Sequence, residues 1–147
     1  MIYRFLFSQS VELGKRTSLI VLSMRVVFGV LLMVHGFQKL AAFDTLAAGA
    51  FPDPLGVGSA ASVSLAIFAE LLCAAAMVVG FLYRLSLIPV IVTLLVAFFA
   101  VHGASVADGE LALVYLFVFI FMYLLGAGRY SADSLIAARF KHNKGLN

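Results

Sequence analysis

Two ionisable side chains lie inside long apolar runs of this sequence. Arg25 is near the middle of the first run and Glu70 near the middle of the second. Counted at ~1.5 Å per residue from the expected outer ends of two helices, Arg25 lies roughly 18 Å deep and Glu70 roughly 15 Å deep. Because an unpaired buried charge is far more costly than a paired one, we expect Arg25 and Glu70 to form a buried ion pair. The pair would either fix helix packing or make Glu70 a group that binds a proton or a ligand.

A second group of polar side chains lies where the apolar runs end. His35 and Lys39 are one helical turn apart, His102 ends the third run, and Glu110 opens the fourth. Together with the hydroxyl of Tyr115, they would line an outward-facing ligand pocket. Two histidines could hydrogen-bond a quinone carbonyl or ligate a haem, and of these two groups we favour a quinone. A third metal ligand is not evident, so no metal site is predicted.

These side chains must be positioned by membrane-spanning helices. Hydrophobic residues make up 64% of the 147 residues and charged residues 12%, whereas soluble domains carry about 25% charged residues. A span needs roughly 20 mostly apolar residues, and the third run has no polar face with which to meet water. We therefore predict an all-α membrane protein, an antiparallel four-helix transmembrane bundle with spans at about 19–37, 59–82, 85–101 and 111–125.

The basic residues of the connections predict the orientation of the four helices. Lys39 stands alone on one side of the predicted bundle, among acidic residues. The other side carries Arg4, Lys15, Arg16, Arg84, Arg129, Arg139, Lys141 and Lys144. Because Lys and Arg accumulate in cytoplasmic loops, we predict that the N- and C-termini are both cytoplasmic.

The segment after the fourth run predicts one further helix. Gly126 and Gly128 end the run, and Ser131 or Asp133 offers an N-cap for a short helix that reaches about Phe140. Its apolar side chains can lie on the membrane surface while its basic side chains meet anionic lipid. We therefore expect an interfacial C-terminal helix and membrane lipid as a partner, and no nucleic-acid partner.

Several of these motifs, taken in order, resemble the DoxX family. The resemblance runs from about Met24 to Leu135. Its motifs are Arg25, His35-Gly36-Phe37-Gln38-Lys39, Ala69-Glu70, Gly80, Arg84, His102 and Gly126-Ala127-Gly128-Arg129-Tyr130-Ser131-Ala132-Asp133. Family members often carry glycines just after the glutamate of the second helix, where this chain has Leu71-Leu72-Cys73. The resemblance implies a single domain over residues 1–147 and a bacterial inner-membrane location.

The resemblance also bears on function. The family is named after a membrane subunit of a thiosulfate:quinone oxidoreductase, and other members look like membrane partners of redox or detoxifying enzymes. It therefore implies a membrane subunit or partner of a quinone-linked oxidoreductase system, with a redox protein as partner. Whether the chain is itself an enzyme, and whether it forms a homo-oligomer, stays open. Two alternatives also stay open: a membrane protein that handles small solutes or lipids, and a non-catalytic scaffold.

Overall fold

A computed structural model describes the backbone of residues 13–144 and the side chains of residues 13–139. It contains four helical segments long and apolar enough to cross a membrane, and no strand within the described range. They are α2 (Lys15–Ala41), Ser59–Val79, Tyr83–Val101 and α7 (Val106–Leu125). The predicted all-α fold with four spans is thereby confirmed. Arg4 lies outside the described residues, and so do the side chains of Lys141 and Lys144.

The second and third segments are not uniform α-helices. The second consists of α4 (Ser59–Ile67), the π-helix η2 (Phe68–Cys73) and α5 (Ala74–Val79). The third consists of α6 (Tyr83–Val96) and the π-helix η3 (Ala97–Val101). The turn between them lies at residues 80–82, before the gap at residues 83–84 between the predicted spans 59–82 and 85–101, because Gly80 adopts φ +76° and ends α5.

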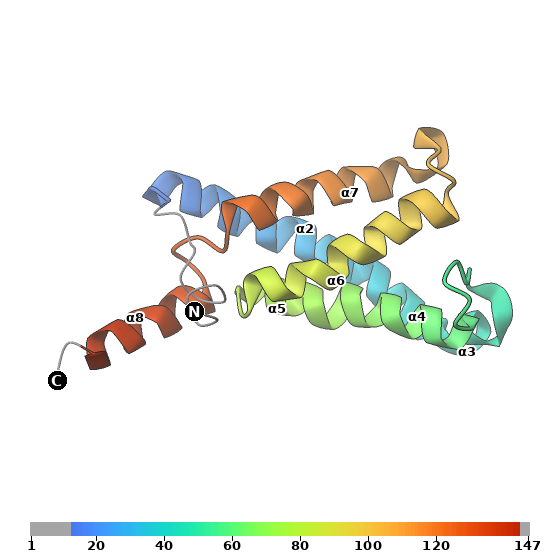
Figure 1. Cartoon of the computed structure of the whole chain (residues 1–147), viewed down its shortest axis with the longest axis horizontal. Helices are drawn as coiled ribbons and strands as arrows, with labels where there is room; N and C mark the ends of the chain where they lie inside the picture. Colours follow the sequence, from blue (N-terminus) through green and yellow to red (C-terminus); the bar gives the residue numbers. More distant parts are fainter. Residues whose placement is uncertain (1–12, 145–147) are drawn as a thin grey trace.

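The helices run side by side along one long axis (Figure 1). One end of the bundle holds the start of α2, the α5–α6 turn and α8 (Ala132–Lys144), and we call it the terminal end. The opposite end, the loop end, holds α3 (Phe43–Thr45), the π-helix η1 (Leu46–Ala50) and the α6–α7 turn. Both described ends of the chain thus lie at the terminal end, as four crossings require.

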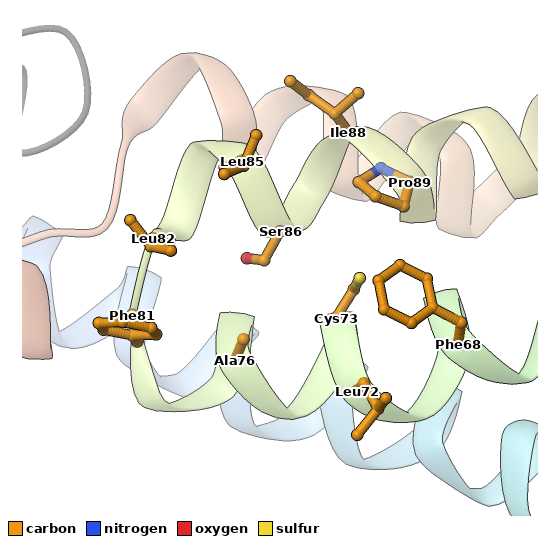
Figure 2. A pocket seen from close by; sticks show the side chains of 10 residues that line it. All are labelled: Phe68, Leu72, Cys73, Ala76, Phe81, Leu82, Leu85, Ser86, Ile88 and Pro89. Atoms are coloured by element: carbon orange, nitrogen blue, oxygen red, sulfur yellow. The ribbon is translucent and has the colours of Figure 1, made fainter. Parts of the chain in front are cut away.

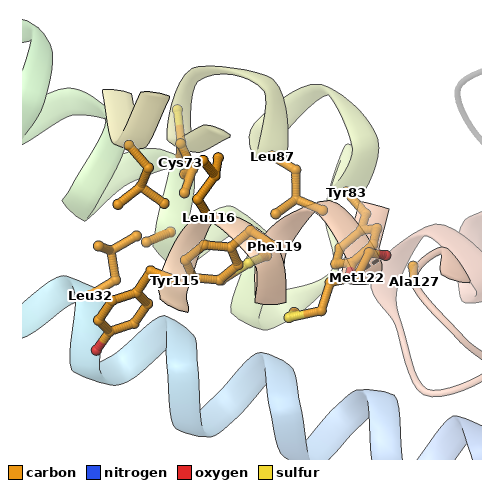
Figure 3. Packing of buried hydrophobic residues seen from close by; sticks show 13 residues of the cluster. Leu32, Cys73, Tyr83, Leu87, Tyr115, Leu116, Phe119, Met122 and Ala127 are labelled. Carbon is orange, nitrogen blue, oxygen red and sulfur yellow. Dashed lines mark hydrogen bonds between the residues drawn. The ribbon is translucent and has the colours of Figure 1, made fainter. Parts of the chain in front are cut away.

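The core of the bundle is narrow. Met77, Leu87, Phe119 and Met122 are fully buried at its centre, and Leu32 packs against them from α2 (Figure 3). Only 28–44% of the most apolar window of each segment is buried. The remaining apolar surface faces outward, as it does in a bundle that lipid surrounds.

The C-terminal helix begins as predicted but is longer. Ser131 is its N-cap, because the Ser131 hydroxyl accepts a hydrogen bond from the Ser134 N–H at 3.2 Å. The helix runs to Lys144 rather than to about Phe140. Asp133, the other predicted cap, serves a different helix, as the site geometry below describes.

Candidate functional site

The predicted ion pair between Arg25 and Glu70 is wrong. Arg25 is 1% exposed and directs its guanidinium at backbone carbonyls, whereas the carboxylate of Glu70 pairs with Lys39. The two charges therefore belong to separate polar sites within the bundle.

At the terminal end, the Arg25 guanidinium joins three parts of the chain. Its Nε donates to Met77 O at 3.1 Å and its Nη2 to Val78 O at 2.6 Å. Its Nη1 donates to Ala127 O at 2.9 Å and to Tyr130 O at 2.8 Å. Met77 and Val78 lie in the last turn of α5, where Met77 O also accepts from the Gly80 N–H at 3.0 Å, so Arg25 adds donors to the last carbonyls of the helix, at the negative end of the helix dipole.

Asp133 completes the same turn from the other side. Its carboxylate accepts hydrogen bonds from the N–H groups of Leu82 and Tyr83, both at 2.9 Å, at the start of α6. The Asp133 N–H in turn donates to Gly80 O at 3.0 Å. The α5–α6 turn is thus capped at its two helix ends by Arg25 from α2 and by Asp133 from α8, which ties both helices to the turn.

The register of α2 against the second segment explains why the pair does not form. A Cβ placed on Gly36 would lie 3.0 Å from the Cβ of Glu70, so these two residues face each other. Arg25 lies eleven residues before Gly36 on α2, which is about 16 Å along the helix axis. The depth estimate ended the first helix near Phe37, whereas α2 continues to Ala41, and these four residues account for about 6 Å of that separation.

Nearer the loop end, Lys39 and Glu70 form an ion pair inside the apolar part of the bundle. Lys39 Nζ donates to Glu70 Oε2 at 2.6 Å. The Glu70 side chain is 9% exposed and that of Lys39 is 25% exposed, so the pair is buried on the glutamate side and open on the lysine side. A charged pair in this position is costly to desolvate, and ionisable groups within membrane spans are rare and often functional.

Two backbone features bring Glu70 to this position. It lies in η2, and π-helical turns within α-helices re-aim side chains and often mark functional sites. Gly36 lets α2 approach η2 closely, since a methyl group there would come within 2.8 Å of Leu71 Cγ.

His35 and Tyr115 meet beside this pair. The imidazole of His35, one helical turn from Lys39, contacts the ring of Tyr115 edge-on with centroids 6.2 Å apart. Tyr115 is 5% exposed and also stacks on Phe119 with centroids 5.8 Å apart. These contacts hold His35 on the face of α2 that carries the ion pair.

The other two residues of the predicted pocket lie elsewhere. His102 packs against Gly109 at the start of α7, and Glu110 is exposed. In Figure 1 the α6–α7 turn, which begins at His102, and the start of α7, which carries Glu110, are well separated from the end of α2 that carries Lys39. No hydrogen bond or ion pair joins His102 or Glu110 to Lys39 or Glu70 among the residues that the structure describes. The five predicted residues therefore do not form one pocket, because α2 and α7 diverge toward the loop end.

Sequence reasoning missed the role of Asp133 and the Lys39–Glu70 pairing. Asp133 was considered only as a cap of its own helix, although its place at the end of a run of family motifs was a usable signal. No group of three or more potential metal ligands occurs among the side chains of residues 13–139.

Comparison with known proteins identifies a family. The family model for DoxX matches residues 20–103, which include Arg25, Lys39, Glu70 and the whole α5–α6 turn. Comparisons with curated proteins and with solved structures gave no match. A family model that covers more than half of the chain identifies the family, and this membrane-spanning chain belongs to the DoxX family.

Proposed function

We propose that this chain is a membrane subunit or partner of a quinone-linked oxidoreductase system in the bacterial inner membrane, and that Lys39 and Glu70 bind the quinone headgroup. The observation that carries the proposal is the Lys39–Glu70 ion pair, which places a cation and a carboxylate together inside an apolar bundle. The resemblance to a family named after a quinone-reducing enzyme's membrane subunit supports the same reading.

The chemistry of quinone reduction calls for these two groups. A quinone takes up two electrons and two protons, and negative charge develops on its carbonyl oxygens as the electrons arrive. The Lys39 ammonium would donate a hydrogen bond to one such oxygen, and the Glu70 carboxylate would take up protons that originate in water and pass them to the quinone oxygens. Lys39 lies in the last turn of α2, near the loop end, where these protons would enter from water.

The electrons come from elsewhere in this scheme. Cys73 is the single cysteine of the chain, so a redox disulfide cannot form within it. A redox partner protein would supply the electrons, while the chain binds the quinone and delivers protons.

The test is quinone binding by the purified protein, read as a shift in thermal unfolding. A thiol-reactive dye can follow unfolding, because Cys73 is the one thiol of the chain and is 7% exposed. We expect short-tailed ubiquinone or menaquinone analogues to raise the unfolding midpoint of the wild type by a few degrees. Glu70→Gln and Lys39→Met should lose this shift, and the exposed control Glu110→Gln should keep it.

Two results would contradict the proposal. One is a wild-type protein that shows no shift with either quinone class and carries no quinone after gentle purification. The other is a shift of the same size in Glu70→Gln and Lys39→Met, which would place quinone binding away from the ion pair.

A further inference from the structure

A groove runs along the outer surface of the bundle between the second and third segments. It encloses about 340 Å³. Its floor is formed by the small side chains of Cys73, Ala76 and Ser86, which lie between the two helices (Figure 2). Its walls and ends are formed by Phe68, Leu72, Phe81, Leu82, Leu85, Ile88 and Pro89. The groove exists because small residues of the two helices face each other at its floor, while larger residues on either side form its walls.

The lining of the groove is suited to a hydrocarbon chain. Its one hydroxyl, that of Ser86, already donates to Tyr83 O within the same helix at 2.9 Å. The walls are open to the outside of the bundle, since Leu72 is 66% exposed and Leu85 is 50% exposed. Both helices have the length and composition of membrane spans, so the groove faces the acyl chains of the bilayer.

The length and direction of the groove match one leaflet. It begins at Phe81 and Leu82 in the α5–α6 turn and ends near Phe68 and Pro89 (Figure 2). From Leu82 to Pro89 the helix rises roughly 10 Å, and one leaflet contributes about 15 Å of hydrocarbon. The groove thus runs along the helices from the terminal end through most of one leaflet.

The charge at the terminal end of the bundle favours an anionic headgroup. The α5–α6 turn lies at this end, which carries exposed basic side chains at the start of α2 (Lys15, Arg16) and around α8 (Arg129, Arg139), whereas the Arg84 guanidinium lies over the ring of Tyr123 on α7. The nearby carboxylate of Asp133 is occupied by the N–H groups of Leu82 and Tyr83. Basic side chains at this depth attract anionic phospholipid headgroups.

From this geometry we infer that the groove between α5 and α6 is a binding site for one acyl chain of an anionic phospholipid from the leaflet at the terminal end. The site is separate from the Lys39–Glu70 pair, so the inference does not depend on the proposed quinone chemistry. Glu70 and the groove-lining Phe68, Leu72 and Cys73 share η2 but serve different neighbours: Glu70 meets α2, whereas the other three line the groove beside α6.

Photolabelling in bilayers of defined composition tests the inference. The protein is placed in nanodiscs with a trace of phosphatidylglycerol carrying a diazirine in its acyl chain, or with phosphatidylcholine carrying the same chain. Labelled positions are then mapped by mass spectrometry. Phe117 on α7 is 54% exposed, close to the 50% of Leu85, and serves as an internal reference for contact with bulk lipid.

We expect the ratio of phosphatidylglycerol to phosphatidylcholine labelling to be several-fold higher around the groove than around Phe117. Ala76→Leu and, as a second variant, Ser86→Leu should fill the groove and lower that ratio to the value at Phe117. The control Ala100→Leu, at an exposed small residue outside the groove, should not change it. Size-exclusion profiles show which variants are folded. If neither variant folds, the labelling ratio of the wild type alone still tests the inference.

Three outcomes would overturn the inference. Equal ratios at the groove and at Phe117 would mean that bulk lipid alone covers the groove. Protection of the groove from both probes, together with a dimer in native mass spectra, would assign it to a second copy of this chain. Loss of groove labelling when a long-tailed quinone is added at low mole fraction would assign it to a quinone tail.

Discussion

Arg25 is a buried cation whose hydrogen-bond partners are backbone carbonyls. A guanidinium carries five N–H donors in a fixed planar fork, which lets one side chain reach the end of α5 and the segment after α7 together. An ammonium is a single point with three donors and cannot span these positions. The type of cation, as well as its charge, therefore matters at this residue.

Arg25→Lys should destabilise the protein by about 3 kcal/mol or more, because hydrogen bonds from a charged donor contribute roughly 1.5–3 kcal/mol each. Thermal or denaturant unfolding in detergent, followed through Cys73, measures the change. Arg16→Lys is the matched control, since Arg16 is exposed at the same end of the bundle. An Arg25→Lys protein as stable as this control would show that the carbonyl contacts are dispensable.

At this scale the sequence predicts which residues matter better than it predicts their partners. Arg25 and Glu70 were found because charged residues inside apolar runs are rare and costly. The partners of Arg25 could not be found in the same way, because they are backbone atoms that any residue type supplies. The Lys39–Glu70 pair depends on the register between two helices, which changes by a full turn when a helix end is misjudged by four residues.

At the scale of elements, the contact between α2 and η2 depends on a glycine. Gly36→Ala would place a methyl group 2.8 Å from Leu71 Cγ and 3.0 Å from Glu70 Cβ, so the two helices must separate. We expect a loss of about 1–3 kcal/mol in stability, the usual cost of overpacking, and a weakened Lys39–Glu70 pair. The control is Gly14→Ala, where no atom lies within 4 Å of the added carbon. Equal unfolding midpoints for the two variants would contradict the close approach.

The start of α4 is held by a carboxylate outside the spans. The pKa of Asp53 is lowered, chiefly by the hydrogen bond from the Ser62 hydroxyl at 2.7 Å and then by the N–H groups of Gly58, Val57 and Gly56. Because the folded pKa lies below the unfolded value of about 4, the stabilisation is complete above that pH. It is lost as the pH falls through the folded pKa.

Hydrogen exchange can measure this pH dependence. The amides of Val57 and Gly58, which donate to Asp53 at 3.0 and 2.7 Å, should be protected at neutral pH and lose protection below about pH 4. Protection factors are taken relative to an unstructured peptide at each pH. Asp53→Asn should give protection that no longer changes with pH, and unchanged pH dependence in this variant would assign the effect to another group.

The presence and the number of the helices were the most predictable features of these elements. An apolar run of about 20 residues has few alternatives to a helix in lipid, because its backbone groups must bond to one another. The π-helical turns were not predictable, since η2 and its neighbours α4 and α5 share the same apolar composition. The turn at Gly80 was misplaced by a few residues for a similar reason. The apolar run continues through Phe81 and Leu82, and the helix ends because Gly80 and then Leu82 adopt a positive φ.

For the whole molecule, the four spans place the described ends of the chain on one side of the membrane. The distribution of Lys and Arg predicts that this side is the cytoplasm. A phosphatase fused after Asn147 should be inactive, because this enzyme is active only outside the cytoplasm. The same reporter inserted after Gly56, in the exposed connection at the loop end, should be active. An active reporter after Asn147 together with an inactive one after Gly56 would contradict the prediction, because it would place the C-terminus outside the cytoplasm.

The central claim is that the bundle has two separate polar sites, a structural one at Arg25 and a candidate ligand site at Lys39–Glu70. Two double-mutant cycles test this division. One combines Lys39→Met with Glu70→Gln, and the other combines Arg25→Met with Glu70→Gln. Unfolding free energies are measured for every single and double variant. Residues in direct contact couple by about 0.5–3 kcal/mol, whereas separated residues add within about 0.5 kcal/mol. We predict coupling in the Lys39 cycle and additivity in the Arg25 cycle. Additivity in the Lys39–Glu70 cycle together with coupling in the Arg25–Glu70 cycle would contradict the division, because it would make Arg25 the partner of Glu70.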